Sequence, residues 1–189
     1  YDEMANETDP VKKEAIGKEI NELTIEAGKV SVSNEFSNLM ESMGGKNLNA
    51  ATGMDLTFYH NSFPTFQINK WLEISSQRFL NPVFRTFQSE WETVYEESNR
   101  GQDNPGRVQY DIQSKAYEGH PYARSVLGLP EHLKNPRLSQ LIKFYNDWYT
   151  AENMVLILVG NINANQISGR IASTFGRLPQ RATPERKTY

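Results

Sequence analysis

The chain has 189 residues, of which 38% are hydrophobic and 23% charged, and its formal net charge is −3. This size and composition suit one globular domain with its own core, and the scattered lysines and arginines give no reason to expect a nucleic-acid partner. The absence of cysteine excludes disulfides and thiolate metal sites, and the longest apolar run, Met154 to Val159, is too short for a transmembrane segment.

The N-terminal part of the chain predicts two helices. Asp9 followed by Pro10 is a helix start, and apolar residues recur at helical spacing from Ile16 to Ala27 within a mostly charged segment. We therefore expect residues 1–33 to form a polar helical insertion or linker, which packs loosely on a domain or pairs with another helix. A second helix is expected over residues 34–43. Its buried stripe is predicted to comprise Phe36, Leu39, Met40 and Met43.

Strand-like alternation follows in residues 47–61, where Gly53 marks a bend or bulge. Four helical segments are then predicted. The first begins at Pro64, the second is a glutamate-rich stretch that ends near Gly101, and the third and fourth begin at Asn104-Pro105 and Asn135-Pro136. The third of these segments is expected to turn Val108, Ile112 and Ala116 inward.

The apolar run from Met154 to Val159 predicts a strand that is buried on both faces or lies under helices. A last helix is expected to use Ile167, Ile171 and Phe175 and to end at Gly176. This order of helices and strands is typical of the α+β class, with helices stacked on a sheet.

Two carboxylates of the glutamate-rich segment lie beside its apolar stripe. At about 100° per residue, Glu90 and Glu97 fall within roughly 20° of each other on the flank of that stripe, about 10.5 Å apart along the helix axis. Such carboxylates meet an arginine or lysine from a neighbouring helix, extend out into water, or serve a metal or acid–base site. The geometry alone favours the first two possibilities over the third. The stripe itself comprises Phe84, Phe87, Trp91 and Val94.

Five segments, in this order, resemble the pitrilysin/insulinase family of zinc peptidases, which includes the mitochondrial processing peptidases and many bacterial zinc proteases. The resemblance spans residues 34–179 and implies an α+β fold in which helices pack on one face of an antiparallel sheet. It implies that residues 34–189 are a partial, processing-peptidase-like metallohydrolase domain, truncated at its N-terminal side. The segments are GGKNLNAATGMDLTFY, ETVYEESNRGQDNP, EGHPYARSVLGLPEHL, FYNDWYTAENMVLILVGNI and FGRLP.

The resemblance also implies a zinc site, with Glu97 as a metal ligand and Glu90 as its supporting catalytic carboxylate. In the family an inverted motif, His-x-x-Glu-His, supplies two further ligands and the general base. The three histidines of this chain, His60, His120 and His132, belong to no such motif and are expected to be surface or capping residues. The motif is expected upstream of Tyr1, so this chain alone is not expected to hold zinc or to be active.

Asn49, Ala50, Ala51 and Thr52 match the strand against whose edge family members bind a peptide substrate as an added strand. The implied function is part of a zinc-dependent endopeptidase that hydrolyses peptides or small unfolded proteins and faces a second homologous domain or subunit. The alternative is a non-catalytic family member, a scaffold or partner subunit in which salt bridges occupy Glu90 and Glu97. An unrelated helical binding module is a third hypothesis.

Overall fold

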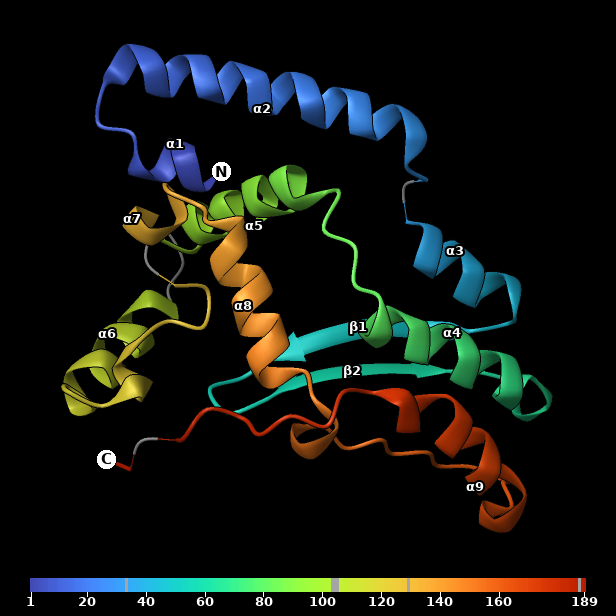
Figure 1. Ribbon diagram of the computed structural model, residues 1–189. Helices are drawn as coiled ribbons and strands as arrows, with labels where there is room; N and C mark the ends of the chain where they lie inside the picture. The colour runs from blue at the N-terminus through green and yellow to red at the C-terminus, as the bar shows by residue number, and fades with distance from the viewer. Residues whose placement is uncertain (33, 103–105, 129, 187) are drawn as a thin grey trace.

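The computed structural model describes residues 1–32, 34–102, 106–128, 130–186 and 188–189 (Figure 1). These residues form a mostly helical chain around one antiparallel hairpin, which confirms the predicted α+β class. The helices and strands are α1 (Asp2–Asn6), α2 (Pro10–Val30), α3 (Glu35–Ser42), β1 (Lys46–Thr52), β2 (Thr57–Ser62), α4 (Ile68–Leu80), α5 (Phe87–Gln102), α6 (Gly106–Ala116), α7 (Pro130–Leu133), α8 (Leu138–Trp148) and α9 (Ala164–Ser173). Single 3₁₀ turns are η1 (Thr65–Gln67), η2 (Pro121–Ala123), η3 (Ala151–Asn153) and η4 (Phe175–Arg177).

Helix α2 starts as predicted and lies along the outside of the molecule. The Asp9 side chain accepts hydrogen bonds from the backbone N–H groups of Val11 and Lys12, at 2.9 and 3.4 Å, and so caps the helix. Helix α1 lies beneath the first turns of α2 (Figure 1), and Met4 reaches close to the backbone at Gly17. No residue of α2 is buried.

Residues 46–62 form a hairpin rather than the single bent strand that the alternation predicts. The backbone N–H of Gly53 donates to the Leu56 carbonyl at 2.9 Å, which closes the turn between β1 and β2. In the antiparallel register Ala50 lies opposite Tyr59 and Thr52 opposite Thr57. The glycine that marked a bend is therefore the first residue of a chain reversal, and the alternation belongs to two strands.

Buried side chains concentrate around α3 and α4. Leu72 is fully buried in the middle of α4, and Trp71 donates from its indole nitrogen to Asn61 Oδ1 at 3.0 Å, which ties this helix to β2. On its other side α4 packs against α9, where Glu73 and Arg170 form an ion pair. The buried hydrophobic residues are Met40, Met43, Ile68, Leu72 and Leu178.

The predicted strand from Met154 to Val159 is wrong for the described residues, because this segment is extended but pairs with no strand among them. Val155, Ile157 and Val159 are 85%, 69% and 94% exposed, although a continuous apolar run predicts burial on both faces. A continuous apolar run indicates that its residues favour burial, but it does not identify the segments that would cover them.

Helix α6 also differs from its prediction. Val108 and Ile112 are 64% and 57% exposed, and Ala116 is exposed too, so the predicted inward face of this helix points largely to solvent. The predicted start of the helix at Asn104-Pro105 lies outside the described residues. In α3, Leu39 is 41% exposed, whereas Met40 and Met43 are buried as predicted. Helical spacing identifies an apolar face, but a neighbouring element has to cover it before it becomes core.

Candidate functional site

Helix α5 carries the two carboxylates that the sequence analysis selects. Its position is fixed by Trp91, whose indole N–H donates to the carbonyl of Leu133, the last residue of α7, at 2.5 Å. At the start of the helix, the ring of Phe87 meets that of Tyr1 edge-on at 4.8 Å. Phe84, predicted within the apolar stripe, precedes the helix and packs against Tyr145 of α8 at 6.0 Å.

Glu90 and Glu97 are both exposed on α5, and neither side chain has a hydrogen bond or an ion pair within the described residues. Their two acidic neighbours are engaged instead. Glu92 accepts from Gln88 at 2.6 Å, and Glu96 pairs with an arginine one turn further on at 3.3 Å. The carboxylates of Glu90 and Glu97 are therefore available to a ligand or to another part of the protein, and the salt bridges that the scaffold alternative predicts are absent from the part of the chain described here.

The histidines do not join these carboxylates in a metal site. His120 Nδ1 accepts the backbone N–H of Tyr122 at 3.1 Å and caps η2, which confirms the capping prediction for this residue. His60 is exposed and stacks on Phe58 at 5.3 Å, and His132 is exposed on α7. Over the described ranges there is no cluster of three or more His, Cys, Asp or Glu side chains that could hold a metal ion.

The free edge of β1 is the second candidate site. Antiparallel neighbours alternate between pairs that exchange hydrogen bonds and pairs that do not. Because Gly53 bonds to Leu56, counting back along β1 assigns Ala51 to the bonded set, whereas Ala50 and Thr52 are not bonded to β2. The peptide groups of Ala50 and Thr52 therefore face the edge of β1 that no described strand covers.

One of these outward groups already has a local partner. The backbone N–H of Ala50 donates to the side-chain oxygen of Asn49 at 2.8 Å. Asn49, Ala50, Ala51 and Thr52 are all exposed. An extended peptide can reach this edge without moving any covering element of the described structure, and it has to displace only the Asn49 side chain to reach the Ala50 N–H.

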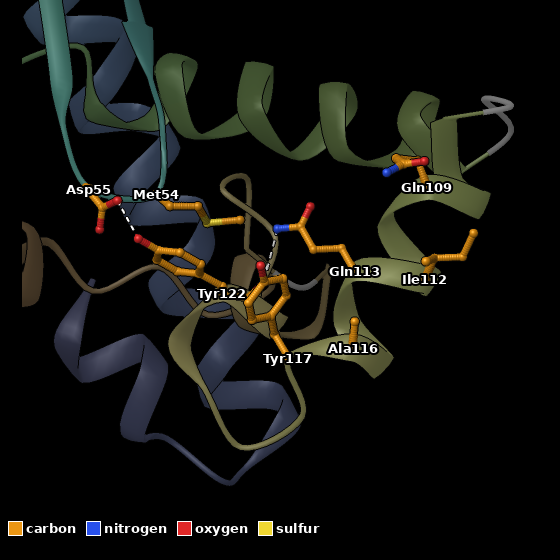
Figure 2. A pocket seen from close by; sticks show the side chains of 8 residues that line it. All are labelled: Met54, Asp55, Gln109, Ile112, Gln113, Ala116, Tyr117 and Tyr122. Atoms are coloured by element: carbon orange, nitrogen blue, oxygen red, sulfur yellow. Dashed lines mark hydrogen bonds between the residues drawn. The ribbon is translucent and has the colours of Figure 1, made fainter. Parts of the chain in front are cut away.

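A cavity of about 530 Å³ opens beside the tip of the hairpin (Figure 2). Met54 and Asp55 approach it from the turn between the strands, and Tyr122 points at Asp55 from η2, donating its phenolic hydrogen to Oδ2 at 2.5 Å. This hydrogen bond to Asp55 is the main reason that the pKa of Tyr122 is raised above its ordinary value. Helix α6 forms the opposite wall with Gln109, Ile112, Gln113 and Ala116, and Tyr117 follows it.

No residue of this cavity was predicted as a site residue, and Ile112 and Ala116 were predicted only as apolar residues on the inward face of a helix. Asp55 stands in a hairpin turn, where an aspartate ordinarily has a conformational role, and Tyr122 belongs to a loop 67 positions further along the chain. The segments around both residues do belong to the family-like pieces GGKNLNAATGMDLTFY and EGHPYARSVLGLPEHL. That resemblance was the only signal near the cavity, and it does not indicate that the two segments touch.

Comparison with known proteins finds relatives that are named zinc proteases. Residues 20–129 match the family model described as insulinase (peptidase family M16), and residues 137–189 match the model described as the peptidase M16 inactive domain. Over 186 residues the chain is 26% identical to the zinc protease PqqE of Helicobacter pylori, covering 95% of this chain and 41% of that protein. It is 26% identical over 142 residues to the mitochondrial-processing peptidase subunit beta of Dictyostelium discoideum, covering 74% of this chain and 30% of that subunit.

Solved structures agree with the sequence relatives. A protease from Helicobacter pylori superposes with a TM-score of 0.71 at 25% identity, over 85% of this chain and 38% of that protein. The periplasmic protease PqqL from Escherichia coli gives a TM-score of 0.70 at 26% identity, over 82% and 18% of the two chains. The chain thus spans about two fifths of the length of the first relatives it matches. No helix within the described residues is long and apolar enough to cross a membrane.

Proposed function

Because the chain belongs to the insulinase family of peptidases (peptidase family M16), we propose that it forms part of a zinc-dependent endopeptidase acting on peptides or small unfolded proteins. The observation that carries the proposal is a pair of carboxylates, Glu90 and Glu97, seven residues apart on α5. Neither has a partner among the described residues, whereas Glu92 and Glu96 between them are engaged. Relatives named zinc proteases support the same class of reaction.

Glu97 is proposed as one ligand of the zinc ion. A catalytic zinc takes three protein ligands, and the described residues offer this carboxylate without a competing partner but no imidazole cluster beside it. The histidine ligands and the general base are therefore proposed to come from outside the described residues. When bound, zinc supplies Lewis-acid polarisation of the scissile carbonyl.

Glu90 is proposed to orient the ligands of the zinc ion by hydrogen bonding to them. Carboxylates that hydrogen-bond to metal ligands fix the orientation of those ligands, and their loss ordinarily costs about 10- to 100-fold in metal affinity or activity. Two turns of helix separate Glu90 from Glu97, so both side chains leave α5 in nearly the same direction. Glu90 thus acts on the ligands of the metal rather than on the metal itself.

The β1 edge is proposed to receive the substrate. A peptide added beside β1 gains backbone hydrogen bonds from Ala50 and Thr52, while exposed Asn49 and Ala51 contact its neighbouring residues. Residues 34–189 are proposed as a partial peptidase domain, residues 1–33 as a polar helical insertion, and a second homologous domain or subunit as the partner that faces it.

The test is the zinc content of the full-length protein that contains this chain. We expect about one zinc per chain in the wild type and in the Glu92→Gln control, and loss of both zinc and peptide hydrolysis in Glu97→Gln. Glu90→Gln should keep a folded protein with reduced activity or zinc affinity. Stoichiometric zinc in Glu97→Gln would overturn the ligand assignment. A wild-type protein without zinc or activity would favour the non-catalytic scaffold instead.

A further inference from the structure

We propose that the helix pair α1–α2 positions helix α5, which carries the proposed zinc ligand, and that Tyr1 is the positioning residue through which the pair acts. The inference rests on the proposed function, because it concerns how the carboxylates of Glu90 and Glu97 are aimed. Residues 1–19 lie outside both segments that match a family model, so all of α1 and the first part of α2 are additional to the matched peptidase segments. Tyr1 acts on α5 rather than on the metal.

Helix α5 is held in place by few buried side chains. Among residues 87–100, Ser98 alone is buried, whereas the apolar residues Phe87, Trp91 and Val94 are only half-buried. In most helices an apolar face packed into the core fixes the position of the helix. Because α5 lacks such a face within this range, individual side-chain contacts decide how the helix is rotated about its axis.

Tyr1 bridges the helix pair and the first turn of α5, beside which α1 lies (Figure 1). Its ring meets the ring of Phe87 edge-on, with the centroids 4.8 Å apart and the ring planes at 89°. Its hydroxyl forms a side-chain hydrogen bond with Thr24 of α2. Burial is the main reason that the pKa of Tyr1 is raised, the hydrogen bond with Thr24 lowers it, and the charge of Glu92 on α5 raises it further. One side chain therefore touches α2 and α5 at once.

The helix pair also supports the second anchor of α5. The indole of Trp91 donates to the last carbonyl of α7, and Asn135, which follows α7, accepts from Lys13 Nζ of α2 at 3.0 Å. Ser139, at the start of α8, donates to Asp2 Oδ1 of α1 at 2.8 Å. The helix pair, α5 and the segment from α7 to α8 thus form a closed set, in which each member contacts the other two.

The turn between α1 and α2 makes the helix pair a firm support. The Glu7 carboxylate accepts the backbone N–H groups of Thr8 and Asp9 at 2.8 and 2.9 Å, directly before the start of α2. Met4 of α1 lies so close to Gly17 of α2 that a Cβ on this glycine would be 3.9 Å from the methionine sulfur. Contacts at both ends of α1 therefore fix it against α2.

A small rotation of α5 about its axis would misplace both carboxylates. At about 100° per residue, Glu90 and Glu97 project about 60–80° around the helix from Phe87, at about 6 Å from the axis. A rotation of about 20° at this radius moves each carboxyl group by about 2 Å, whereas a functional site holds its groups within about 0.5 Å. The contact between Tyr1 and Phe87 opposes this rotation, because an edge-on ring pair depends on both distance and angle.

The experiment measures the zinc dissociation constant of the full-length protein by competition with a fluorescent chelator, at a temperature where every variant is folded. Tyr1→Ala should raise this constant about two- to tenfold, which corresponds to the loss of one aromatic pair. Tyr1→Phe keeps the ring contact with Phe87 and should bind zinc nearly as the wild type does. Hydrogen exchange of the amides of residues 90–97, measured on zinc-free protein, should be faster in Tyr1→Ala than in the wild type.

Two further variants separate positioning from general stability. Phe87→Ala removes the other ring of the pair, so combining it with Tyr1→Ala should raise the zinc dissociation constant little beyond the effect of one substitution. Phe175→Ala is the matched control, because this half-buried ring packs on Trp71 and Phe79 at 6.2 and 6.3 Å, away from α5. It should lower the melting temperature but leave zinc affinity and the exchange of α5 unchanged.

The outcomes separate this inference from the proposed function. Wild-type zinc affinity in Tyr1→Ala, whether or not the exchange of α5 changes, would overturn the positioning role and leave the peptidase proposal standing. An equal loss of zinc affinity in Phe175→Ala would also overturn it, because the effect would then follow stability alone. A wild-type protein that binds no zinc would overturn the proposed function, and the positioning role with it.

Discussion

Replacing Ala50 with proline tests whether the outward edge of β1 binds substrate. The Ala50 N–H faces away from β2 and is accepted only by the neighbouring Asn49 side chain, at 2.8 Å. Proline removes this donor but leaves the ladder between the two strands intact, because strand edges tolerate proline where the N–H faces outward. The substitution therefore acts on a bound peptide rather than on the hairpin.

The size of the effect follows from one lost backbone hydrogen bond. Such a bond contributes about 0.5–1.5 kcal/mol net, which corresponds to a two- to twelvefold rise in the dissociation constant of the peptide. The proline ring also projects toward the incoming strand, so the upper part of this range is expected. Zinc-free, full-length protein and a fluorescent extended peptide in an anisotropy assay give the constant directly.

The matched variant is Ala51→Pro, one residue further along. Ala51 lies opposite Phe58 in a pair that exchanges hydrogen bonds, so proline there removes a ladder bond and should lower the melting temperature. Ala50→Pro should melt close to the wild type. Unchanged peptide affinity in Ala50→Pro, in a protein that melts normally, would refute the assignment of this edge to the substrate.

Three further predictions concern the stability of the fold. Burial raises the pKa of Tyr145 to about 12, so the free energy of unfolding should hold below pH 10.0 and fall as the pH rises from there toward about 12; Tyr145→Phe should flatten that fall in urea titrations at each pH. Leu72→Ala should cost about 2–5 kcal/mol because its side chain is fully buried, whereas Leu23→Ala on α2, at 58% exposure, should cost less than about 1 kcal/mol in the same assay. Asp9→Ala should cost about 1 kcal/mol and reduce the helical signal in circular dichroism, since two N–H groups lose their cap.

Local signals predicted the elements that depend on nearby residues. Asp9 and Pro10 start α2 because capping and a fixed φ act within one turn. The apolar stripe ending at Met43 predicts α3 because helical spacing is also a local pattern. The resemblance added the family, which the matches confirm. The roles of Glu90 and Glu97 stay predictions, because the structure places both carboxylates without showing what they bind.

Features that depend on distant residues were not predictable in the same way. The cavity needs Asp55 and Tyr122 to meet across 67 positions, and no spacing rule encodes such a contact. Ile112 has an apolar side chain at helical spacing, yet its exposure depends on what lies opposite α6. The prediction that Met154 to Val159 is buried was wrong for a similar reason. Whether a strand is buried depends on neighbouring segments, which its own residues do not determine.

The bare, extended run from Met154 to Val159 has a consequence for handling the protein. These six consecutive residues are uncharged, and their backbone groups have no backbone partner in the described part of the chain. Three of their apolar side chains face water on one side, so the segment is a template for pairing between molecules. Preparations of these 189 residues alone should therefore self-associate as their concentration rises, through contacts between like segments. Light scattering over a dilution series would detect this tendency before any assay of activity is attempted.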